Sequence, residues 1–173
     1  MATLLFWCSA ALVVYAYLGY PCALMALALV RTRPVGPPRI TPRVSFIIAA
    51  HNEEVRIAEK IQNTLDQDYP AEHLEIIVAS DCSTDRTDEI VRACGHRVRH
   101  VRTAERRGKE AAQQLAMQVA VGEIMVFSDV ATALAPHGVS TIVRSFADGS
   151  VGCVSSIDRF VGADGQASGE GAY

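Results

Sequence analysis

The first 30 residues contain no charged side chain and no histidine. A bilayer core of ~30 Å is crossed by about 20 helical residues, so this apolar run is long enough to span a membrane. A cleaved signal peptide would instead need a basic start and an apolar stretch of only about 7–15 residues. We therefore expect a retained transmembrane helix over residues 1–30, which Pro21 would kink or divide into two parts.

The chain also lacks the excess of basic residues that is typical of nucleic-acid-binding proteins. It has 16 Lys and Arg against 19 Asp and Glu, and its formal net charge is −3, so we expect no nucleic-acid partner. The five cysteines form no CxxC pair, which argues against a disulfide framework and favours a reducing cytosol. His96 and His100 have no third ligand nearby in the sequence, which argues against a zinc site.

Residues 31–43 are rich in arginine, and no acidic residue occurs after the apolar run until Glu53. Positive charge beside a membrane span favours the cytoplasmic side, so we expect the N-terminus outside and the remainder in the cytosol. The segment Pro34-Val35-Gly36-Pro37-Pro38 is typical of a short stiff linker. The predicted organisation is a transmembrane helix at 1–30, a basic linker at 31–43 and a soluble domain at 44–173.

Short apolar runs alternate with helical patterns from residue 44 onwards. The predicted strands are residues 44–50, 74–79, 98–101, 124–127 and 151–154. The first predicted helix follows Asn52 as its N-cap and carries the apolar stripe Val55, Ile57, Ile61 and Leu65. The second follows possible caps at 83–85, the third begins at Lys109 and the fourth at Pro136. This alternation predicts an α/β domain with a parallel sheet covered by helices on both faces.

Acidic residues follow three of these strands. Glu53, Asp81 and Asp129 lie in the segments that leave the strands at 50–53, 80–83 and 128–131. A single Asp at a strand end is usually a turn former or a helix cap, and Asp85 is interpreted as a cap. Because ligands bind at the carboxyl ends of parallel strands, acids at three exits indicate a binding site at that edge.

Two common nucleotide-binding motifs are missing. The first strand is not followed by GxGxxG, which excludes the dinucleotide-binding fingerprint. Gly108-Lys109 is similar to the end of a P-loop, but Thr103 stands at the required first glycine and Glu110 at the magnesium-binding Ser or Thr. An ordinary P-loop nucleotidase is therefore not expected.

The segments around these strand exits resemble family-2 glycosyltransferases, which have the GT-A fold. The resemblance rests on four segments in order, namely Ala49-Ala50-His51-Asn52-Glu53-Glu54, Ser80-Asp81-Cys82-Ser83-Thr84-Asp85, Arg107-Gly108-Lys109 and Phe127-Ser128-Asp129. It implies a Rossmann-like, mostly parallel sheet with flanking helices over residues 44–173, preceded by one transmembrane helix. The apolar N-terminal run and the arginine-rich linker are similar to the membrane-attached branch of the family, which makes polysaccharides or glycolipids.

The resemblance also implies a role for individual residues in binding a nucleotide sugar, and these are Ala50, Glu53, Asp81, Arg107, Lys109 and Asp129. Asp81 matches the acid that accepts a hydrogen bond from the base, which suits the imide N–H of uracil because an ionised carboxylate only accepts. Glu53 matches the acid near the base and ribose. Lys109, beside Arg107, matches the basic element facing the diphosphate, where a cation offsets the leaving-group charge. Asp129 matches the first Asp of the DxD motif, which holds Mg²⁺ or Mn²⁺.

The sequence departs from the family pattern at three positions and in its length. Ala131 stands at the last DxD position, Cys82 replaces the usual glycine after Asp81, and Gln114 replaces a common asparagine. In the family, the catalytic base and the acceptor-binding motifs follow the DxD region. We therefore expect a GT-A domain that is incomplete at its C-terminus, with the base beyond Tyr173. Asp158 and Glu170 are only weak candidates for that base.

The expected function is an inverting transfer of a sugar from a nucleotide-sugar donor, UDP-linked, to a saccharide or lipid acceptor. One alternative is a non-catalytic membrane protein that keeps a nucleotide-binding half-domain, which Ala131 favours. A nucleotidyltransferase would need a glycine-rich basic loop after the first strand, where His51-Asn52-Glu53-Glu54 is acidic instead. The transferase hypothesis depends on one spatial condition: Glu53, Asp81 and Asp129 must converge on a common cleft rim and together hold the nucleotide.

Overall fold

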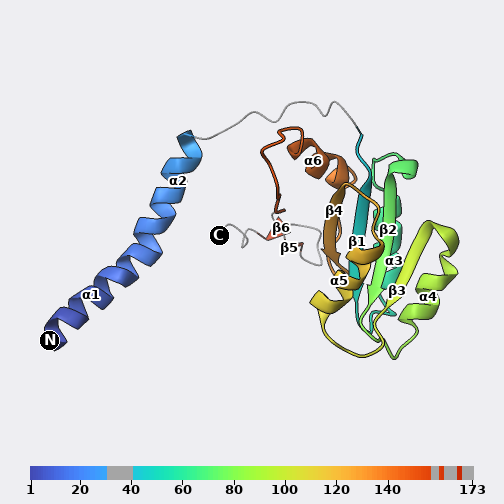
Figure 1. The fold of residues 1–173 in the computed structure, drawn as a ribbon, viewed down its shortest axis with the longest axis horizontal. Helices are drawn as coiled ribbons and strands as arrows, with labels where there is room; N and C mark the ends of the chain where they lie inside the picture. Colours follow the sequence, from blue (N-terminus) through green and yellow to red (C-terminus); the bar gives the residue numbers. More distant parts are fainter. Residues whose placement is uncertain (31–40, 157–159, 162–166, 169–173) are drawn as a thin grey trace. The chain divides into compact units, whose positions relative to one another are not determined.

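The structure, a computed structural model, consists of two compact units (Figure 1). It describes residues 1–30, 41–156, 160–161 and 167–168. The first unit, Met1–Val35, contains an apolar helix, and the second, Gly36–Tyr173, contains an α/β sheet. The predicted stiff segment at 34–38 lies outside the described residues.

The first unit is helical from Ala2 onwards. It comprises α1 (Ala2–Val14), a π-helical turn η1 (Tyr15–Gly19) and α2 (Tyr20–Val30). The stretch Ala2–Leu29 is one helix of 28 residues, long and apolar enough to cross a membrane. Pro21 does not divide it. The π-helical turn ends at Gly19, two residues before Pro21, and a π turn is one way for a helix to accommodate a residue without a backbone N–H.

The second unit is built on a four-stranded sheet in which every neighbouring pair is parallel. Its strands, in the spatial order β3-β2-β1-β4, are β3 (Val98–Arg102), β2 (Leu74–Ser80), β1 (Val44–Ala50) and β4 (Ile124–Asp129). This arrangement confirms the predicted α/β class and four of the five predicted strands.

Helices cover both faces of this sheet (Figure 1). One face carries α3 (Ile57–Leu65), α4 (Thr87–Ala93) and α6 (Gly138–Ser145), and the other carries α5 (Lys109–Val119). Two 3₁₀ turns, η2 (Ala71–His73) and η3 (Gly95–Arg97), lead into β2 and β3. The predicted helices are confirmed as elements, although α3 and α6 are shorter than the sequence pattern suggested.

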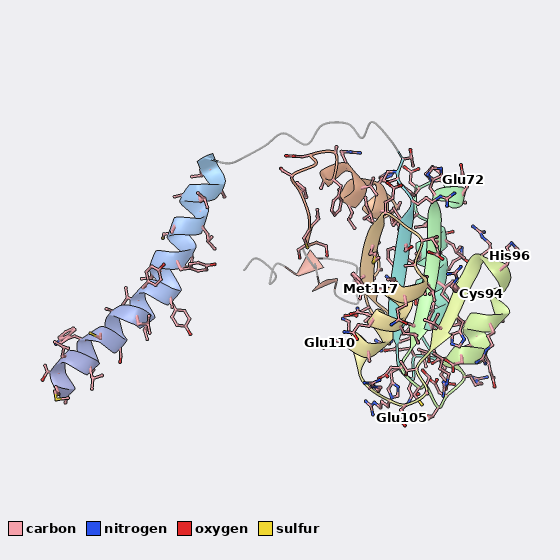
Figure 2. The ribbon with its side chains drawn as sticks, in the orientation of Figure 1. Glu72, Cys94, His96, Glu105, Glu110 and Met117 are labelled. Atoms are coloured by element: carbon pink, nitrogen blue, oxygen red, sulfur yellow. The ribbon has the colours of Figure 1, made fainter. Side chains whose placement is uncertain are left out.

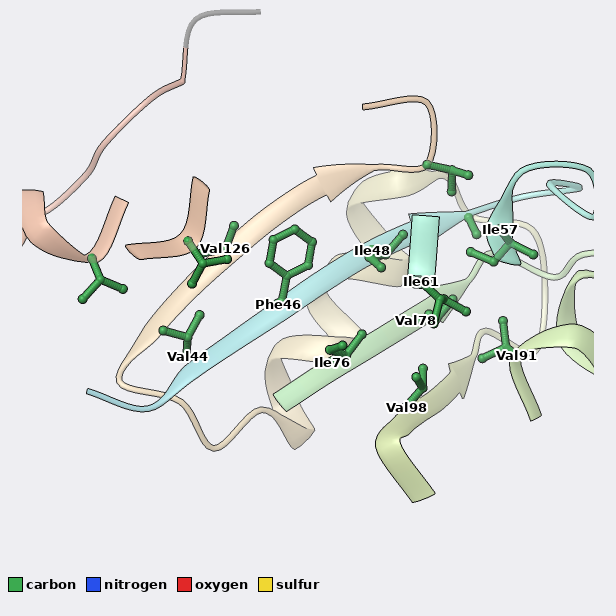
Figure 3. Close-up of a cluster of buried hydrophobic side chains, with 14 residues drawn as sticks. Val44, Phe46, Ile48, Ile57, Ile61, Ile76, Val78, Val91, Val98 and Val126 are labelled. Carbon is green, nitrogen blue, oxygen red and sulfur yellow. The ribbon is translucent and has the colours of Figure 1, made fainter. Parts of the chain in front are cut away.

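The core explains why β1 is almost entirely apolar, with Ser45 as its one polar residue. Phe46 and Ile48 point toward α3 and pack in the cluster shown in Figure 3, while Ile47 points toward α5. Ala112 and Ala116 of α5 are fully buried against that second face, and their small side chains let the helix approach closely. A strand buried on both faces has no solvent side, so it shows no polar alternation.

Two predictions at the start of α3 are wrong. The N-cap is Arg56 and not Asn52, which adopts a positive φ of 53° and accepts the N–H of Thr84 through its side chain. Val55 lies before the helix and is 87% exposed, so it does not belong to the apolar stripe. The long-range contact with Thr84 outweighs the local capping preference of Asn52.

The strand predicted at 151–154 is also wrong. These residues form neither a strand nor a helix, and Gly152 and Cys153 are exposed. Strand propensity depends on a neighbouring strand and on burial, which this segment does not have in the part of the chain that the structure describes. Instead, β5 (Phe160–Val161) pairs in antiparallel fashion with β6 (Ala167–Ser168). Asp158 and Glu170 lie outside the described residues.

The strand order places a switch point between β1 and β4. The chain runs from β1 outward through β2 to β3, and then returns across the sheet to β4 on the other side of β1. Crevices form outside the carboxyl ends of the strands at such a reversal, because the two connections leave in opposite directions. Asp129 pairs with Ala49 at this point.

Candidate functional site

The predicted acidic residues all lie at the carboxyl edge of the sheet. Ala50 ends β1, and its carbonyl accepts the N–H of Asp81 at 2.8 Å. Asp129 ends β4, and Glu53 lies in the loop that follows β1. In Figure 2, Glu105 and Glu110 mark this end of the sheet, opposite to Glu72. The structure therefore places Glu53, Asp81 and Asp129 at one edge of the sheet, which is the first part of the condition on which the transferase hypothesis depends.

Asp81 is 4% exposed, and its carboxylate is already hydrogen-bonded within the protein. Oδ1 accepts the hydroxyl of Thr103 at 3.2 Å and the N–H of Arg107 at 2.9 Å, and Oδ2 accepts the N–H of Gly108 at 2.8 Å. Burial alone would raise the pKa of Asp81, but these hydrogen bonds outweigh it and hold the pKa below the ordinary 3.8. Since a carboxylate has about four acceptor positions, one position on Oδ2 remains.

These hydrogen bonds determine where α5 begins. Gly108 is the N-cap of α5 and has a φ of +91°, a conformation that favours glycine. Its N–H is held by Asp81, and Lys109 follows as the first helical residue. Asp81 therefore positions the loop that presents Lys109 to the edge of the sheet.

Lys109 and Asp129 form an ion pair at the switch point. Nζ lies 2.6 Å from Oδ1, and both side chains are 54% exposed. An ion pair this exposed contributes about 1 kcal/mol at most, because water screens both charges. Breaking this ion pair therefore costs little free energy. Lys109 is then able to bind an anionic ligand, and Asp129 a cationic one.

The turn after β4 directs alternate side chains to opposite sides. Ser128 and Val130 are buried, whereas Asp129 and Ala131 are exposed. The two outer positions of the DxD motif therefore both face outward, but Ala131 offers a methyl group where the motif has a carboxylate. Among the described residues no group of three or more His, Cys, Asp or Glu side chains could hold a metal. Asp129 fits as one oxygen ligand of Mg²⁺ or Mn²⁺, with phosphate and water needed for the rest.

The loop after β1 is tied to the start of α4. Glu53 donates its N–H to Thr87 at 2.8 Å, and its carboxylate lies 2.9 Å from Arg56. Asp85 accepts the N–H of Glu54 at 3.0 Å and that of Thr87 at 2.9 Å, but the N-cap of α4 is Arg86, so the prediction of Asp85 as the cap is wrong by one residue. Glu53 thus belongs to the α4 side of the edge, whereas Asp81 and Asp129 bond to residues at the start of α5.

Arg107 reaches the site through its backbone rather than through its guanidinium. Its N–H binds Asp81, while its side chain lines an open cleft between the 102–107 loop and α5. The volume of this cleft is about 510 Å³, and its lining is Arg102, Thr103, Ala104, Glu105, Arg107, Ala111, Gln114, Leu115 and Gln118. The cleft flanks the predicted site, and of the predicted site residues Arg107 lines it.

A partly buried cluster that the sequence did not predict holds the loop after β2. Asp88 of α4 pairs with Arg102 and, at 3.2 Å, with His100, both of β3. Burial would raise the pKa of Asp88, but hydrogen bonds from Ser80 and His100 and the charges of His100 and Arg102 hold it below its ordinary value. Arg102 also donates to the carbonyl of Ser83 at 2.9 Å, so the cluster anchors the segment that carries Asp81.

Lys60 is a second residue that the sequence did not single out. It lies on α3, is only 2% exposed, and donates to the hydroxyl of Ser128 at 2.8 Å and to the carbonyl of Thr132 at 2.5 Å. Burial lowers its pKa to about 8, although the charge of Asp129 acts in the opposite direction. The available signal was a lysine within the apolar stripe, next to Ile57 and Ile61.

Comparison with known proteins identifies relatives of this domain. The family model described as Glycosyl transferase family 2 matches residues 45–169. A probable glycosyltransferase YdaM of Bacillus subtilis (strain 168) is 50% identical over 50 residues, which are 29% of this chain and 12% of that protein. The beta-monoglucosyldiacylglycerol synthase of Synechocystis sp. is 35% identical over 98 residues, which are 51% of this chain and 20% of that protein.

Solved structures show the same fold. The mannosyltransferase PcManGT from Pyrobaculum calidifontis, in complex with GDP-Man and Mn²⁺, matches with a TM-score of 0.70 and 34% identity over 85% of this chain. Staphylococcus aureus TarS 1-349 in complex with UDP-GlcNAc matches with a TM-score of 0.52 and 26% identity over 57% of this chain. The present chain covers 46% of the first protein and 29% of the second. These likenesses confirm the GT-A fold that the sequence resemblance implied.

Proposed function

The chain belongs to glycosyl transferase family 2, and on that basis we propose that the carboxyl edge of its sheet binds the nucleotide-sugar donor of a glycosyl transfer. The observation that supports this most is the meeting of Lys109 and Asp129, 2.6 Å apart, at the switch point of the sheet. A cation and a carboxylate at this point suit a diphosphate and the metal ion that accompanies it.

We propose that the donor is UDP-linked. Asp81 has about one acceptor position left on Oδ2 after its three internal hydrogen bonds. Uracil presents a single imide N–H, which needs one acceptor, whereas guanine presents two adjacent N–H donors that suit both oxygens of a free carboxylate. Both kinds of nucleotide sugar occur in solved structures of similar proteins, since PcManGT was solved in complex with GDP-Man and TarS 1-349 in complex with UDP-GlcNAc. Glu53 and Ala50 would then lie near the base and ribose.

We further propose that donor binding separates Lys109 from Asp129. Lys109 would turn to the diphosphate and offset the charge that develops as the sugar–phosphate bond breaks. Asp129 would hold the divalent ion, which supplies positive charge to the same phosphate oxygens. The exposed ion pair is weak, so its loss costs little compared with two new charge-assisted contacts.

The membrane part of the proposal concerns the first unit. We propose that residues 1–30 anchor the protein, that the basic segment 31–43 faces the cytoplasm, and that residues 44–173 act there. The acceptor would be a saccharide or a lipid, and the transfer would be inverting. The Synechocystis relative is a synthase of a glucosylated diacylglycerol, which fits an acceptor at the membrane.

A second candidate is a nucleotide-binding protein without transferase activity. The exposed methyl group of Ala131 favours it, because the turn after β4 then offers a metal ion one carboxylate instead of two. Because the base is expected beyond Tyr173, the two candidates are compared in a chain extended past that residue. Release of UDP from a UDP-sugar in the presence of Mn²⁺ and an acceptor would favour the enzyme, and binding of UDP without such release would favour the second candidate.

The proposed donor site is tested with Asp129→Asn in the 173-residue chain in detergent. We expect the affinity for UDP with Mn²⁺, measured by titration calorimetry, to fall by about tenfold or more, because an amide is a poor ligand for a hard cation. Glu72→Gln is the matched control, since this exposed acid lies at the opposite end of the sheet. Equal affinity of wild type and Asp129→Asn would contradict the proposal.

A further inference from the structure

Lys60 keeps a charged group inside the domain. Its Nζ hydrogen bonds go to two uncharged oxygens, and the ammonium lies 5.3 Å from the centre of the Phe46 ring. Lysine is almost never fully buried unless it is paired, because removing the ammonium from water costs several kcal/mol. Two hydrogen bonds to neutral acceptors and a cation–π contact offset only part of that cost. Burial of the Lys60 ammonium therefore has a net cost in the free energy of folding.

The two acceptors lie at the two ends of one turn. Ser128 is the last buried residue of β4, and Thr132 closes the turn by donating its N–H to the carbonyl of Asp129 at 3.2 Å. The ammonium thus bridges the chain before and after Asp129. Ser128 faces α3, whereas Asp129 pairs in the sheet beside Ala49 and points outward toward Lys109. Lys60 therefore binds the turn from the side opposite to the Asp129 carboxylate.

Two further polar residues, Asn63 on α3 and Gln67 just after the helix, bind the chain further on. Asn63 donates to the carbonyl of Leu134 and accepts its N–H, both at 2.9 Å, and Gln67 accepts the N–H of Val139 at 3.1 Å. Lys60 and Asn63 are three residues apart on α3, which places them along one side of the helix. Of these three contacts, the one made by Lys60 reaches the turn that carries Asp129.

We propose that Lys60 is a positioning residue of the donor site, whose buried ammonium holds the turn 128–132 so that the Asp129 carboxylate faces the diphosphate and its metal ion. This inference rests on the proposed function, because it assigns a task to the residue that supports Asp129. Without the ammonium, Ser128 and Thr132 lose their common partner, and the direction of Asp129 is no longer fixed. A displacement of about 1 Å in such a site is enough for a large loss of affinity or rate.

The main test compares Lys60→Met, Lys60→Arg and Asn63→Ala in the 173-residue chain in detergent. Met has a similar length but no charge and no hydrogen-bond donor. We expect Lys60→Met to weaken binding of Mn²⁺ in the presence of UDP by about tenfold, because the turn loses one or two hydrogen bonds from a charged group. Lys60→Arg keeps the charge and the donors, so it should restore binding to within about threefold. Asn63→Ala breaks the neighbouring contact and should leave binding unchanged.

Hydrogen exchange provides a second readout that does not depend on a bound ligand. In Lys60→Met the amides of residues 130–132 should exchange faster than in wild type, while Asn63→Ala should affect residues 133–135 instead. Should Lys60→Met fail to fold, Ser128→Ala replaces it, because it removes one of the two acceptors and keeps the lysine; binding should then weaken by about threefold.

The outcomes separate this inference from the proposed function. If Asp129→Asn binds Mn²⁺ and UDP as wild type does, the donor site itself is misplaced. If Asp129→Asn loses binding while Lys60→Met, or Ser128→Ala in its place, retains it, the donor site stands and the role of Lys60 is overturned. Equal effects of Lys60→Met and Asn63→Ala on binding would also overturn it, because a general loss of packing would then explain both.

Discussion

The carboxylate of Asp81 joins two strand exits that are far apart in the sequence. It follows β2, yet its three hydrogen bonds go to the loop between β3 and α5. The resemblance to the family suggested a residue facing the nucleotide, and the structure adds an internal task, since Asp81 holds Gly108 in a positive-φ conformation. Both tasks need an acceptor-only group, which explains why a carboxylate suits this position.

Asp81→Asn is expected to lower the free energy of unfolding at pH 7 by about 1–3 kcal/mol. The amide of Asn keeps one acceptor oxygen but turns an NH₂ group toward a backbone N–H. Urea denaturation followed by circular dichroism measures the change, and Glu72→Gln serves as the control. An unchanged midpoint for Asp81→Asn would mean that the 103–108 loop is held by other contacts.

Wild type and Asp81→Asn should also differ in how much their free energy of unfolding falls at low pH. The pKa of Asp81 in the folded state lies below the ordinary 3.8, so the unfolded chain takes up the proton first as the pH falls. The contribution of Asp81 is therefore complete above pH 3.8 and is lost as the pH falls through the folded pKa. As the pH falls below about 3.8, wild type should lose more stability than Asp81→Asn. Parallel losses would contradict this assignment.

At the scale of elements, the packing of β1 against the loop before β4 depends on a glycine. A Cβ atom at Gly122 would lie 2.3 Å from the backbone nitrogen of Ser45, far below a possible contact. Gly122 also donates its N–H to the hydroxyl of Ser45 at 2.8 Å, and that hydroxyl donates to Glu75 at 2.7 Å. The approach of the two segments therefore leaves no room for a side chain.

Gly122→Ala is expected to destabilise the domain by about 3 kcal/mol, since the backbone of β1 or of the loop must move to accept the methyl group. Gly149→Ala is the matched control, because a Cβ there meets nothing within 4 Å. Its free energy of unfolding should stay within about 0.5 kcal/mol of wild type. Similar urea midpoints for the two variants would show that the β1 contact is not tight in solution.

The helices were predictable in proportion to their regularity. Residues 109–120 were predicted as a helix from their Ala, Gln and Leu content, and α5 covers Lys109–Val119. The start of α3 was not predictable, because Asn52 is a residue type that favours N-caps but its side chain accepts the N–H of Thr84 instead. Local propensity places an element well when no distant polar partner competes for its ends.

At the scale of the whole molecule, the arginines at 31–43 predict the side of the membrane on which the second unit lies. Exposed Cys153 allows a test with a thiol reagent that cannot cross membranes. In bacterial spheroplasts that express the chain, we expect labelling only after permeabilisation, and Cys153→Ser should reduce that labelling. Equal labelling of intact and permeabilised spheroplasts would place the domain outside and reverse the predicted topology.

The sequence by itself determined the apolar helix, the α/β alternation and the edge at which the acids gather. These features depend on runs and periods of neighbouring residues, and a strand such as β1 that is buried on both faces is mostly apolar. Only the tertiary structure decided which buried polar groups meet. Lys60 and Ser128 are 68 residues apart, and Asp81 and Gly108 are 27 apart. A buried polar group needs a hydrogen-bond partner, and the tertiary fold decides which residue that is. The partner is therefore not visible as a local pattern in the sequence.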